Sequence, residues 1–155
     1  MMNVTDNSSG IILPAAQLTL NAEIEEFERL RTWLQGIALK LKLPEKTICQ
    51  LMIAADEVFT NIAEYAYPGT SGPVTVSAEQ NGSQLKLTFS DSGRAFDPLE
   101  NSEPDITLPL EKRQIGGLGI FVVKKLMDGV EYRRENNCNI LILTKQISAE
   151  AQSCS

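Results

Sequence analysis

Histidine is absent from this chain, and cysteine and aromatic residues are scarce. Without histidine there is no Ser-His-Asp triad, no histidine metal ligand and no phosphohistidine chemistry. The three cysteines, Cys49, Cys138 and Cys154, are odd in number and widely spaced, so they match neither a disulfide framework nor a zinc site. A reducing, cytoplasmic compartment is therefore expected.

Positive charge and long apolar runs are also in short supply. The chain carries 14 Lys and Arg against 20 Asp and Glu, a formal net charge of −6. This balance disfavours nucleic acid and anionic membranes as partners. It leaves room for a phosphate ligand, because backbone amides bind phosphates without net positive charge. No run approaches the ~18 apolar residues of a membrane span, and residues 1–10 lack the Lys and Arg of a secretory signal.

The chain is long enough for one ordinary domain. Its 155 residues, 43% of them hydrophobic, are sufficient to bury a core without disulfides or metals. No internal repeat, low-complexity tract or interdomain linker is visible. We expect one domain over residues 11–147, with flexible tails at 1–10 and 148–155.

An edge strand and a helix are predicted first. Residues 11–20 are rich in apolar side chains but contain Pro14, which favours a short edge strand or arm. Asn21 is suited to cap a helix that begins at Ala22. Apolar residues recur at helical spacing from there to Leu41, which predicts one buried stripe.

A second helix and a β-hairpin follow. Pro44 fits the first turn of a helix, whose apolar stripe continues to Ile62 and which should end before Pro68-Gly69. The hydrophobic pattern then changes to period two. Alternating runs on both sides of Asn81-Gly82 predict a hairpin there.

The second half of the chain begins with a loop. Asp91 to Ile115 is charged and proline-containing, and such long irregular loops in compact domains are usually functional. An apolar helix is predicted from about Ile120 to Asp128, stopped by the glycine that follows. Two strands, near Val130–Arg134 and Ile140–Lys145, should be joined around Asn136-Asn137.

This order of elements predicts the fold class. We expect an α/β (α+β) two-layer sandwich, in which a mostly antiparallel, mixed sheet carries helices on one face. Strands joined as hairpins, rather than strands alternating with helices, disfavour a Rossmann fold.

The first candidate site pairs Glu57 with Asn61, one helical turn apart and away from the apolar stripe. A carboxylate and a carboxamide are oxygen donors that suit Mg²⁺ and an attacking nucleophile. Taken alone, such a pair is more often two solvated polar residues on an exposed face.

The second candidate is Asp91-Ser92-Gly93 at the end of a strand. Asp91 can accept a hydrogen bond from an exocyclic amine such as that of adenine, and Gly93 removes a side chain so that a flat ligand can approach. The alternative is an ordinary turn that leaves a strand.

The third candidate is Gly116-Gly117-Leu118-Gly119, which opens a helix. Glycines expose backbone amides and the helix start adds partial positive charge, a combination that suits a triphosphate. The alternative is a flexible entry into a core helix. The spacing is neither the dinucleotide fingerprint nor the Walker P-loop.

The three segments together are more specific than each alone. Residues 56–61 (Asp-Glu-Val-Phe-Thr-Asn), 91–98 (Asp-Ser-Gly-Arg-Ala-Phe-Asp-Pro) and 116–128 (Gly-Gly-Leu-Gly-Ile-Phe-Val-Val-Lys-Lys-Leu-Met-Asp) resemble the N, G1 and G2 boxes of the GHKL ATPases. Within that superfamily the chain resembles the anti-sigma-factor serine kinases of the RsbW type. The resemblance covers about residues 15–146 and implies the Bergerat ATPase fold, which is like that of histidine kinases.

The resemblance implies a role for each polar residue. Glu57 matches the family's general base, which activates an acceptor hydroxyl. Asn61 matches the ligand of Mg²⁺, and Asp91 matches the carboxylate that reads adenine in ATP. Gly93 and Phe96 are expected to bind the cofactor beside Asp91.

The resemblance also implies a phosphate site. Gly117 and Gly119 match glycines that let the phosphates meet backbone amides, and Gly116 and Leu118 belong to the same segment. Residues 99–115 correspond to the family's ATP lid. There, charge and position make Lys112 and Arg113 candidates to reach a phosphate.

One position departs from the family pattern. The family commonly has His-Ala-Tyr after the N box, whereas this chain has Tyr65-Ala66-Tyr67. Tyrosine can pack or donate a hydrogen bond there, but it cannot take up a proton at neutral pH. The tyrosine leaves the expectation of nucleotide binding unchanged. It bears on catalytic efficiency, because a group that could take up a proton is absent at this position.

The expected function is therefore that of an ATP-binding anti-sigma regulator and serine/threonine kinase. Its partners would be an anti-anti-sigma (STAS) protein as acceptor and a sigma factor to sequester, and the family commonly forms homodimers. The alternatives are an ATP-gated binding module without catalysis, a histidine-kinase catalytic fragment that acts only in trans, and a domain with an unused pocket.

Overall fold

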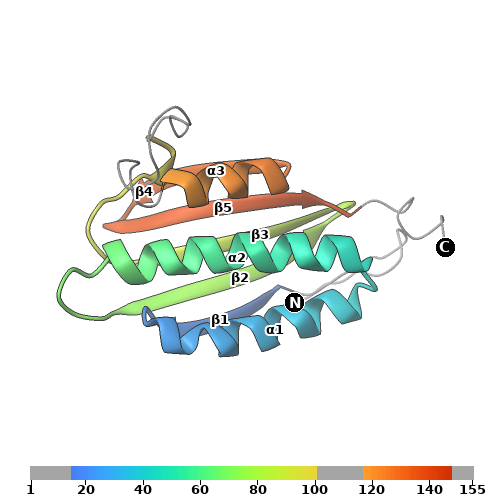
Figure 1. The fold of residues 1–155 in the computed structure, drawn as a ribbon, viewed down its shortest axis with the longest axis horizontal. Coiled ribbons are helices and arrows are strands. Elements are labelled where there is room, and N and C mark those ends of the chain that lie inside the picture. The colour runs from blue at the N-terminus through green and yellow to red at the C-terminus, as the bar shows by residue number, and fades with distance from the viewer. Residues whose placement is uncertain (1–14, 101–116, 148–155) are drawn as a thin grey trace.

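The computed structural model describes residues 15–100 and 117–147, which form one sheet covered by three α-helices (Figure 1). In chain order, the elements are β1 (Ala16–Asn21), η1 (Ile24–Glu26), α1 (Phe27–Lys40), α2 (Glu45–Tyr65), β2 (Pro73–Asn81), β3 (Gln84–Asp91), η2 (Pro98–Glu100), α3 (Gly117–Leu126), β4 (Gly129–Glu135) and β5 (Cys138–Gln146).

The sheet has five strands in the order β1-β2-β3-β5-β4, and the helices lie side by side on one face of it (Figure 1). This confirms the two-layer α/β architecture. All four strand pairs described are antiparallel, so the described part of the sheet is not mixed as expected. Two of these pairs, β2–β3 and β4–β5, are hairpins, and hairpin-joined strands run antiparallel.

The edge strand is confirmed at β1, but the helix after it begins later than predicted. Asn21 does not cap a helix: it is the last residue of β1 and pairs with Pro73. A short 3₁₀ turn follows, and α1 begins only at Phe27, without a side-chain cap hydrogen bond. The first helical turn begins at Ile24, with Glu23 at its N-cap, so no helix starts directly after Asn21. Helix α2 ends at Tyr65, before Pro68-Gly69 as predicted.

Both predicted hairpins are present. In the first, Asn81 still pairs with Gln84, so the two turn residues are Gly82 and Ser83, one position later than the sequence suggests. Gly82 has φ of +63°, a backbone conformation that glycine adopts without strain. In the second, Asn136 and Asn137 have φ of +53° and +62°, as a type I′ turn requires.

The core lies between the sheet and the helices. Alternate residues of β2, β3 and β5 face it, and so do the apolar stripes of the helices. Its largest fully buried side chains are Phe59, Phe89, Leu30, Leu34, Leu51, Leu85, Leu87, Leu143, Val58, Val74, Val76 and Val123. The same alternation continues past Phe89 to Asp91, which therefore also points toward the helix layer. It faces Asn139, its partner in the β3–β5 ladder.

Helix α3 begins at Gly117, three residues before the predicted start near Ile120, and Gly129 begins β4 directly after the following turn. The Lys145 ammonium donates a hydrogen bond to the carbonyl of Leu126 at the helix end (2.7 Å). Part of the predicted long loop is ordered as η2. The segment 101–116 lies outside the described residues.

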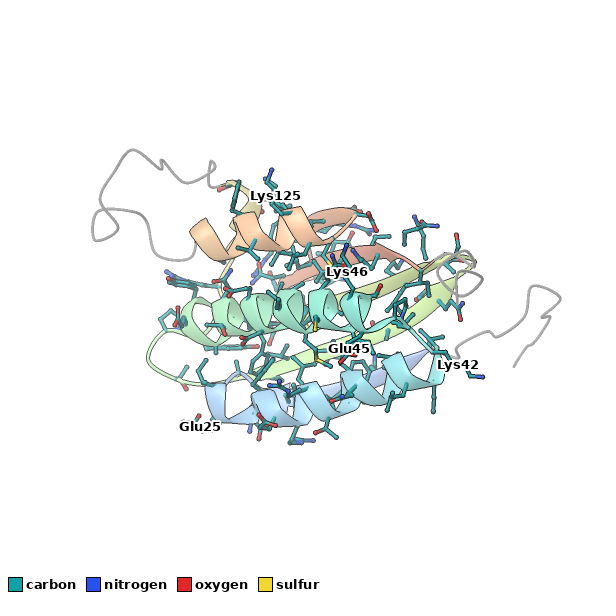
Figure 2. All side chains as sticks on the ribbon, turned by 45° about the vertical axis from the view of Figure 1, so that its right-hand side comes forward. Glu25, Lys42, Glu45, Lys46 and Lys125 are labelled. Atoms are coloured by element: carbon teal, nitrogen blue, oxygen red, sulfur yellow. The ribbon has the colours of Figure 1, made fainter. Side chains whose placement is uncertain are left out.

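The outward surface of the helix layer carries charged side chains, together with the exposed apolar side chains of Leu39 and Ile53. Glu25, Lys42, Glu45, Lys46 and Lys125 are exposed and extend away from the core (Figure 2). Within residues 15–100 and 117–147, no helix combines the length and apolar character that crossing a membrane would need.

Candidate functional site

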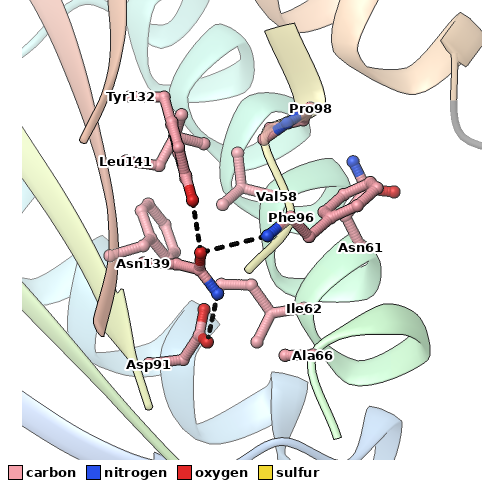
Figure 3. A pocket seen from close by; sticks show the side chains of 11 residues that line it. Val58, Asn61, Ile62, Ala66, Asp91, Phe96, Pro98, Tyr132, Asn139 and Leu141 are labelled. Carbon is pink, nitrogen blue, oxygen red and sulfur yellow. Dashed lines mark hydrogen bonds between the residues drawn. The ribbon is translucent and has the colours of Figure 1, made fainter. Parts of the chain in front are cut away.

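A pocket with an empty volume of about 390 Å³ opens between α2 and the ends of β3, β4 and β5 (Figure 3). Most of its wall is apolar, and a few polar side chains converge on it, which is the usual composition of a small-molecule site. Its lining residues are Val58, Asn61, Ile62, Ala66, Phe89, Asp91, Phe96, Pro98, Tyr132, Asn139 and Leu141.

Asn61 is a buried polar residue in this wall. It is only 8% exposed, and its carboxamide makes no hydrogen bond to any residue that the structure describes. It is therefore not a solvated surface side chain, as the alternative for the Glu57–Asn61 pair would have it. Buried polar groups in native proteins almost always have a partner, so this amide has hydrogen-bonding capacity available for a group in the pocket.

Glu57 lies one turn before Asn61 and outside the pocket lining, against the first turns of α3. A Cβ atom added to Gly119 would lie 2.5 Å from Oε1 of Glu57, so this carboxylate occupies the space that a side chain at Gly119 would need. The pKa of Glu57 is raised above its ordinary value of 4.5, mainly because the side chain is partly buried and to a smaller extent because of the negative charges of Asp56 and Glu64. A carboxylate with a raised pKa is a stronger base once ionised.

Asp91 ends β3 and is 5% exposed. Its Oδ1 accepts hydrogen bonds from the backbone N–H of Gly93 (2.9 Å) and from Nδ2 of Asn139 (2.9 Å). Its Oδ2 has no hydrogen-bond donor among the residues described. One oxygen of a buried carboxylate is thus free to accept from a donor placed in the apolar pocket, and an exocyclic amine is such a donor.

Gly93 serves a closer contact than the one expected. A Cβ atom there would lie 2.2 Å from the carbonyl oxygen of Ala66, so the glycine lets the segment after β3 approach the end of α2. Arg94 secures this junction: its backbone N–H bonds to Ala66 O and its Nε to Tyr65 O, both at 2.9 Å. The contact that requires glycine at position 93 is therefore made within the protein, with the Ala66 carbonyl.

Tyr65, where the family commonly has histidine, packs on Phe96. The two rings stack with centroids 5.2 Å apart and an interplanar angle of 28°. Burial and the charge of Glu64 raise the pKa of Tyr65 above 10.0, so its hydroxyl stays protonated at neutral pH. Its visible role is to support Phe96, which forms part of the pocket wall.

The described part of the predicted phosphate segment, residues 117–119, is not among the residues that line this pocket. Gly117 and Leu118 form the first turn of α3, and Gly119 adjoins Glu57. Gly116, Lys112 and Arg113 lie outside the described residues, as does nearly all of the lid segment 99–115.

Two polar residues of the pocket were not predicted from the sequence. Asn139 and Tyr132 line it and hydrogen-bond to one another (Figure 3). The alternation that buries Leu141 and Leu143 extends back to Asn139, which is a signal that this polar residue faces the core. For Tyr132, on an edge strand, the sequence offers no comparable signal.

The residues present are compatible with a nucleotide and with Mg²⁺ held through it. No group of three or more His, Cys, Asp or Glu side chains in the described part of the chain is arranged to bind a metal. Mg²⁺ in nucleotide sites needs only one or two protein ligands, because phosphates and water fill the remaining positions. The orphaned Asn61 amide could supply such a ligand.

Comparisons with known proteins are consistent with this geometry. The chain is 29% identical to the serine/threonine-protein kinase BtrW of Bordetella bronchiseptica over 120 residues, which cover 77% of this chain and 84% of the relative. It is 32% identical to the serine-protein kinase RsbW of Listeria monocytogenes over 148 residues, which cover 89% and 94%.

Solved structures share the fold. The RsbU and RsbW domains of Rv1364c from Mycobacterium tuberculosis match with a TM-score of 0.64 at 17% identity, over 87% of this chain and 33% of that one. The histidine kinase domain of Erythrobacter litoralis EL346 matches with a TM-score of 0.55 at 18% identity, over 83% and 63%. The family model described as a histidine kinase-like ATPase domain matches residues 20–145. The chain therefore belongs to the histidine kinase-like ATPase family and, within it, to the group of RsbW-like kinases.

Proposed function

We propose that this protein binds ATP with Mg²⁺ and transfers the γ-phosphate to a serine or threonine of a partner protein. The proposal rests on Oδ2 of buried Asp91, which has no donor among the described residues, in an apolar pocket that also contains the Asn61 amide, likewise without a described partner. The similarity to serine/threonine kinases that cover most of the chain supports the same reaction class.

In this proposal each residue acts on a different part of the nucleotide. The apolar pocket receives adenine, and Asp91 accepts a hydrogen bond from its amine. Asn61 supplies an oxygen to Mg²⁺, whose charge offsets that of the phosphates when bound. The backbone amides of Gly116–Gly119, at the start of α3, hold phosphate oxygens.

Glu57 is the proposed base. It takes the proton of the acceptor hydroxyl, whose oxygen then forms a bond to the γ-phosphorus as the bond to the leaving ADP oxygen breaks. Its raised pKa suits this task. Positioning and charge stabilisation supply most of the rate enhancement in such transfers.

The proposed acceptor is a STAS-type anti-anti-sigma protein, and a sigma factor is the proposed sequestered partner. Membership in the RsbW-like group supports both proposals, and it also supports a homodimer. A second candidate is a regulator that uses ATP only to control binding. Tyr65 favours it, because this residue packs on Phe96 and cannot accept a proton as histidine can.

The deciding experiment combines binding and transfer. Calorimetry should show Mg-ATP binding to the wild type, and Asp91→Asn should weaken it about 5- to 150-fold, because an amide donor can then face the adenine amine. Incubation with γ-labelled ATP and candidate STAS proteins should label the acceptor. Binding without any transfer, together with ATP-dependent partner affinity, would replace the kinase with the regulator.

A further inference from the structure

Asn139 joins three separate parts of the pocket. It lies near the start of β5, 6% exposed and opposite Asp91 in the β3–β5 ladder. Its Nδ2 donates to Oδ1 of Asp91 (2.9 Å) and to the carbonyl of Arg94 (2.7 Å). Its Oδ1 accepts from the backbone N–H of Phe96 (3.2 Å) and from the hydroxyl of Tyr132 (Figure 3).

These four contacts fix the orientation of the amide. Both hydrogens on Nδ2 are used, and Oδ1 receives two donors, so the side chain is fully satisfied. If the amide were flipped, its oxygen would face the acceptors at Asp91 and Arg94, and its NH₂ group would face two donors. Asn139 therefore keeps a hydrogen-bond donor directed at Asp91 and has no remaining polar group to offer a ligand.

Tyr132 reinforces this orientation from the edge strand β4. Burial raises the pKa of Tyr132 above its ordinary value of 10.0, so the hydroxyl keeps its proton at neutral pH and donates it to Asn139. The resulting chain of donors runs from β4 through β5 to the carboxylate at the end of β3.

Asp91 receives the last hydrogen bond of this series. Its Oδ1 is occupied by Asn139 and by the backbone N–H of Gly93, whereas its Oδ2 has no donor in the described chain. We propose that Asn139 is a positioning residue for base recognition: it binds one oxygen of Asp91 so that the other is presented to the amine of the nucleotide base, and Tyr132 holds Asn139 in the orientation this requires. This inference rests on the proposed nucleotide function.

Asn139 also contacts the segment that forms the pocket wall, through Arg94 and Phe96. A variant at Asn139 could therefore weaken any nucleotide simply by loosening that wall. The test must separate a loss confined to the amine–Asp91 bond from a general loss of the pocket.

Two ligands that differ only in the amine distinguish these two kinds of loss. ATP carries the 6-amino group, and purine riboside 5′-triphosphate is the same molecule without it. We would titrate both, by calorimetry with Mg²⁺, into wild type, Asn139→Ala and Tyr132→Phe. Tyr65→Phe is the matched control. It removes a hydroxyl that forms no hydrogen bond to any described residue, and it keeps the ring that stacks on Phe96 near the same pocket.

The expected result is selective. Asn139→Ala should weaken ATP about 5- to 150-fold and Tyr132→Phe about 2- to 10-fold, with affinity for the amine-free analogue unchanged in both. Tyr65→Phe should change neither. Combining Asn139→Ala with Asp91→Asn should weaken ATP no further than Asp91→Asn alone, because both remove the same interaction.

The failures are distinguishable. If wild type binds ATP and Asn139→Ala weakens both ligands by the same factor, Asn139 has a structural role only and the inference is overturned. If Asn139→Ala does not fold, Tyr132→Phe decides by the same comparison. If wild type binds neither triphosphate, the proposed function fails and this inference fails with it.

Discussion

Glu57 combines a raised pKa with a position beside the start of α3. Its carboxylate is partly buried, and the neighbouring charges of Asp56 and Glu64 disfavour its ionisation further. A general base must be ionised, so phosphate transfer should fall as the pH is lowered through the pKa of Glu57. Because that pKa is raised, the acidic limb of the pH–rate profile should lie above 4.5, the ordinary value for glutamate.

The acidic limb of the pH–rate profile should move when a charged neighbour of Glu57 is replaced. Asp56→Asn removes one of the charges that raise the Glu57 pKa, so the limb should shift to lower pH. Glu57→Gln should remove the limb and slow transfer about 10²- to 10⁴-fold, as loss of a general base does. The measurement is the initial rate of acceptor labelling against pH at saturating ATP. A limb that Asp56→Asn leaves in place or moves upward would exclude Glu57 as the titrating base.

The buried amide of Asn61 is expected to lower the folding stability of the domain while serving Mg²⁺ binding. Its buried amide has no partner in the described chain, so the isosteric Asn61→Leu should leave the free energy of unfolding unchanged or increase it. The same variant should abolish the Mg²⁺-dependent part of ATP binding, whereas Asn61→Asp retains an oxygen ligand and should preserve it. Calorimetry with and without Mg²⁺ measures this. Equal Mg²⁺ dependence in wild type and Asn61→Leu would remove Asn61 from the metal site.

At the scale of elements, the contact between α2 and α3 passes through a glycine. A side chain at Gly119 would meet Oε1 of Glu57 at 2.5 Å, and this atom is the mobile end of a long side chain. Gly119→Ala should therefore fold normally but displace the carboxylate. Misplacement of a reacting group by about 1 Å costs on the order of 10²-fold in rate.

The readout for Gly119→Ala is the transfer rate at saturating ATP, compared with the midpoint of urea unfolding. A slow enzyme with wild-type stability is the expected outcome. Unchanged transfer would mean that the Glu57 carboxylate need not occupy the place it has in this structure.

The junction between α2 and the segment after β3 depends on another glycine. A Cβ atom at Gly93 would lie 2.2 Å from the backbone carbonyl oxygen of Ala66, and neither backbone can yield easily. Gly93→Ala should lower the free energy of unfolding by about 1–3 kcal/mol, the usual cost of overpacking. Gly36→Ala, in α1 with nothing within 4 Å, is the matched control and should stabilise by about 0.5–1 kcal/mol. Urea denaturation that found both changes equivalent would contradict the close approach.

At the scale of the whole molecule, nucleotide binding joins elements that are far apart in the chain. The pocket takes residues from α2, β3, β4 and β5, so a ligand there should stabilise the folded domain as one unit. ATP at 100 times its dissociation constant should add about 2.7 kcal/mol. For a domain of this size that raises the melting temperature by roughly 5–10 °C.

Thermal unfolding followed by circular dichroism, with Mg-ATP added or omitted, measures this shift. Asp91→Asn at the same ATP concentration is the control and should show a smaller rise. No shift in wild type at a concentration that saturates calorimetric binding would mean that ATP also binds the unfolded chain.

Most of the secondary-structure elements and three polar residues of the candidate site could be predicted from local sequence. Helical spacing and the change to period two depend only on neighbouring residues, and so do the hairpin signals at Asn81-Gly82 and Asn136-Asn137. Glu57, Asn61 and Asp91 could be selected because each lies in a short segment that resembles a family motif. These are local properties, readable within a few turns or one strand.

How these parts meet could not be predicted from the sequence, because it depends on long-range contacts. Strand β5 pairs with β3 as well as with β4, and that order places Asn139 opposite Asp91, 48 residues away in the chain. Asn21 pairs with Pro73 at the end of β1, and the first helical turn begins three residues later, at Ile24. The need for glycine at position 93 comes from Ala66 O, on another element. Such contacts depend on strand order and register, which are set by packing of the whole core and are not encoded in any single segment.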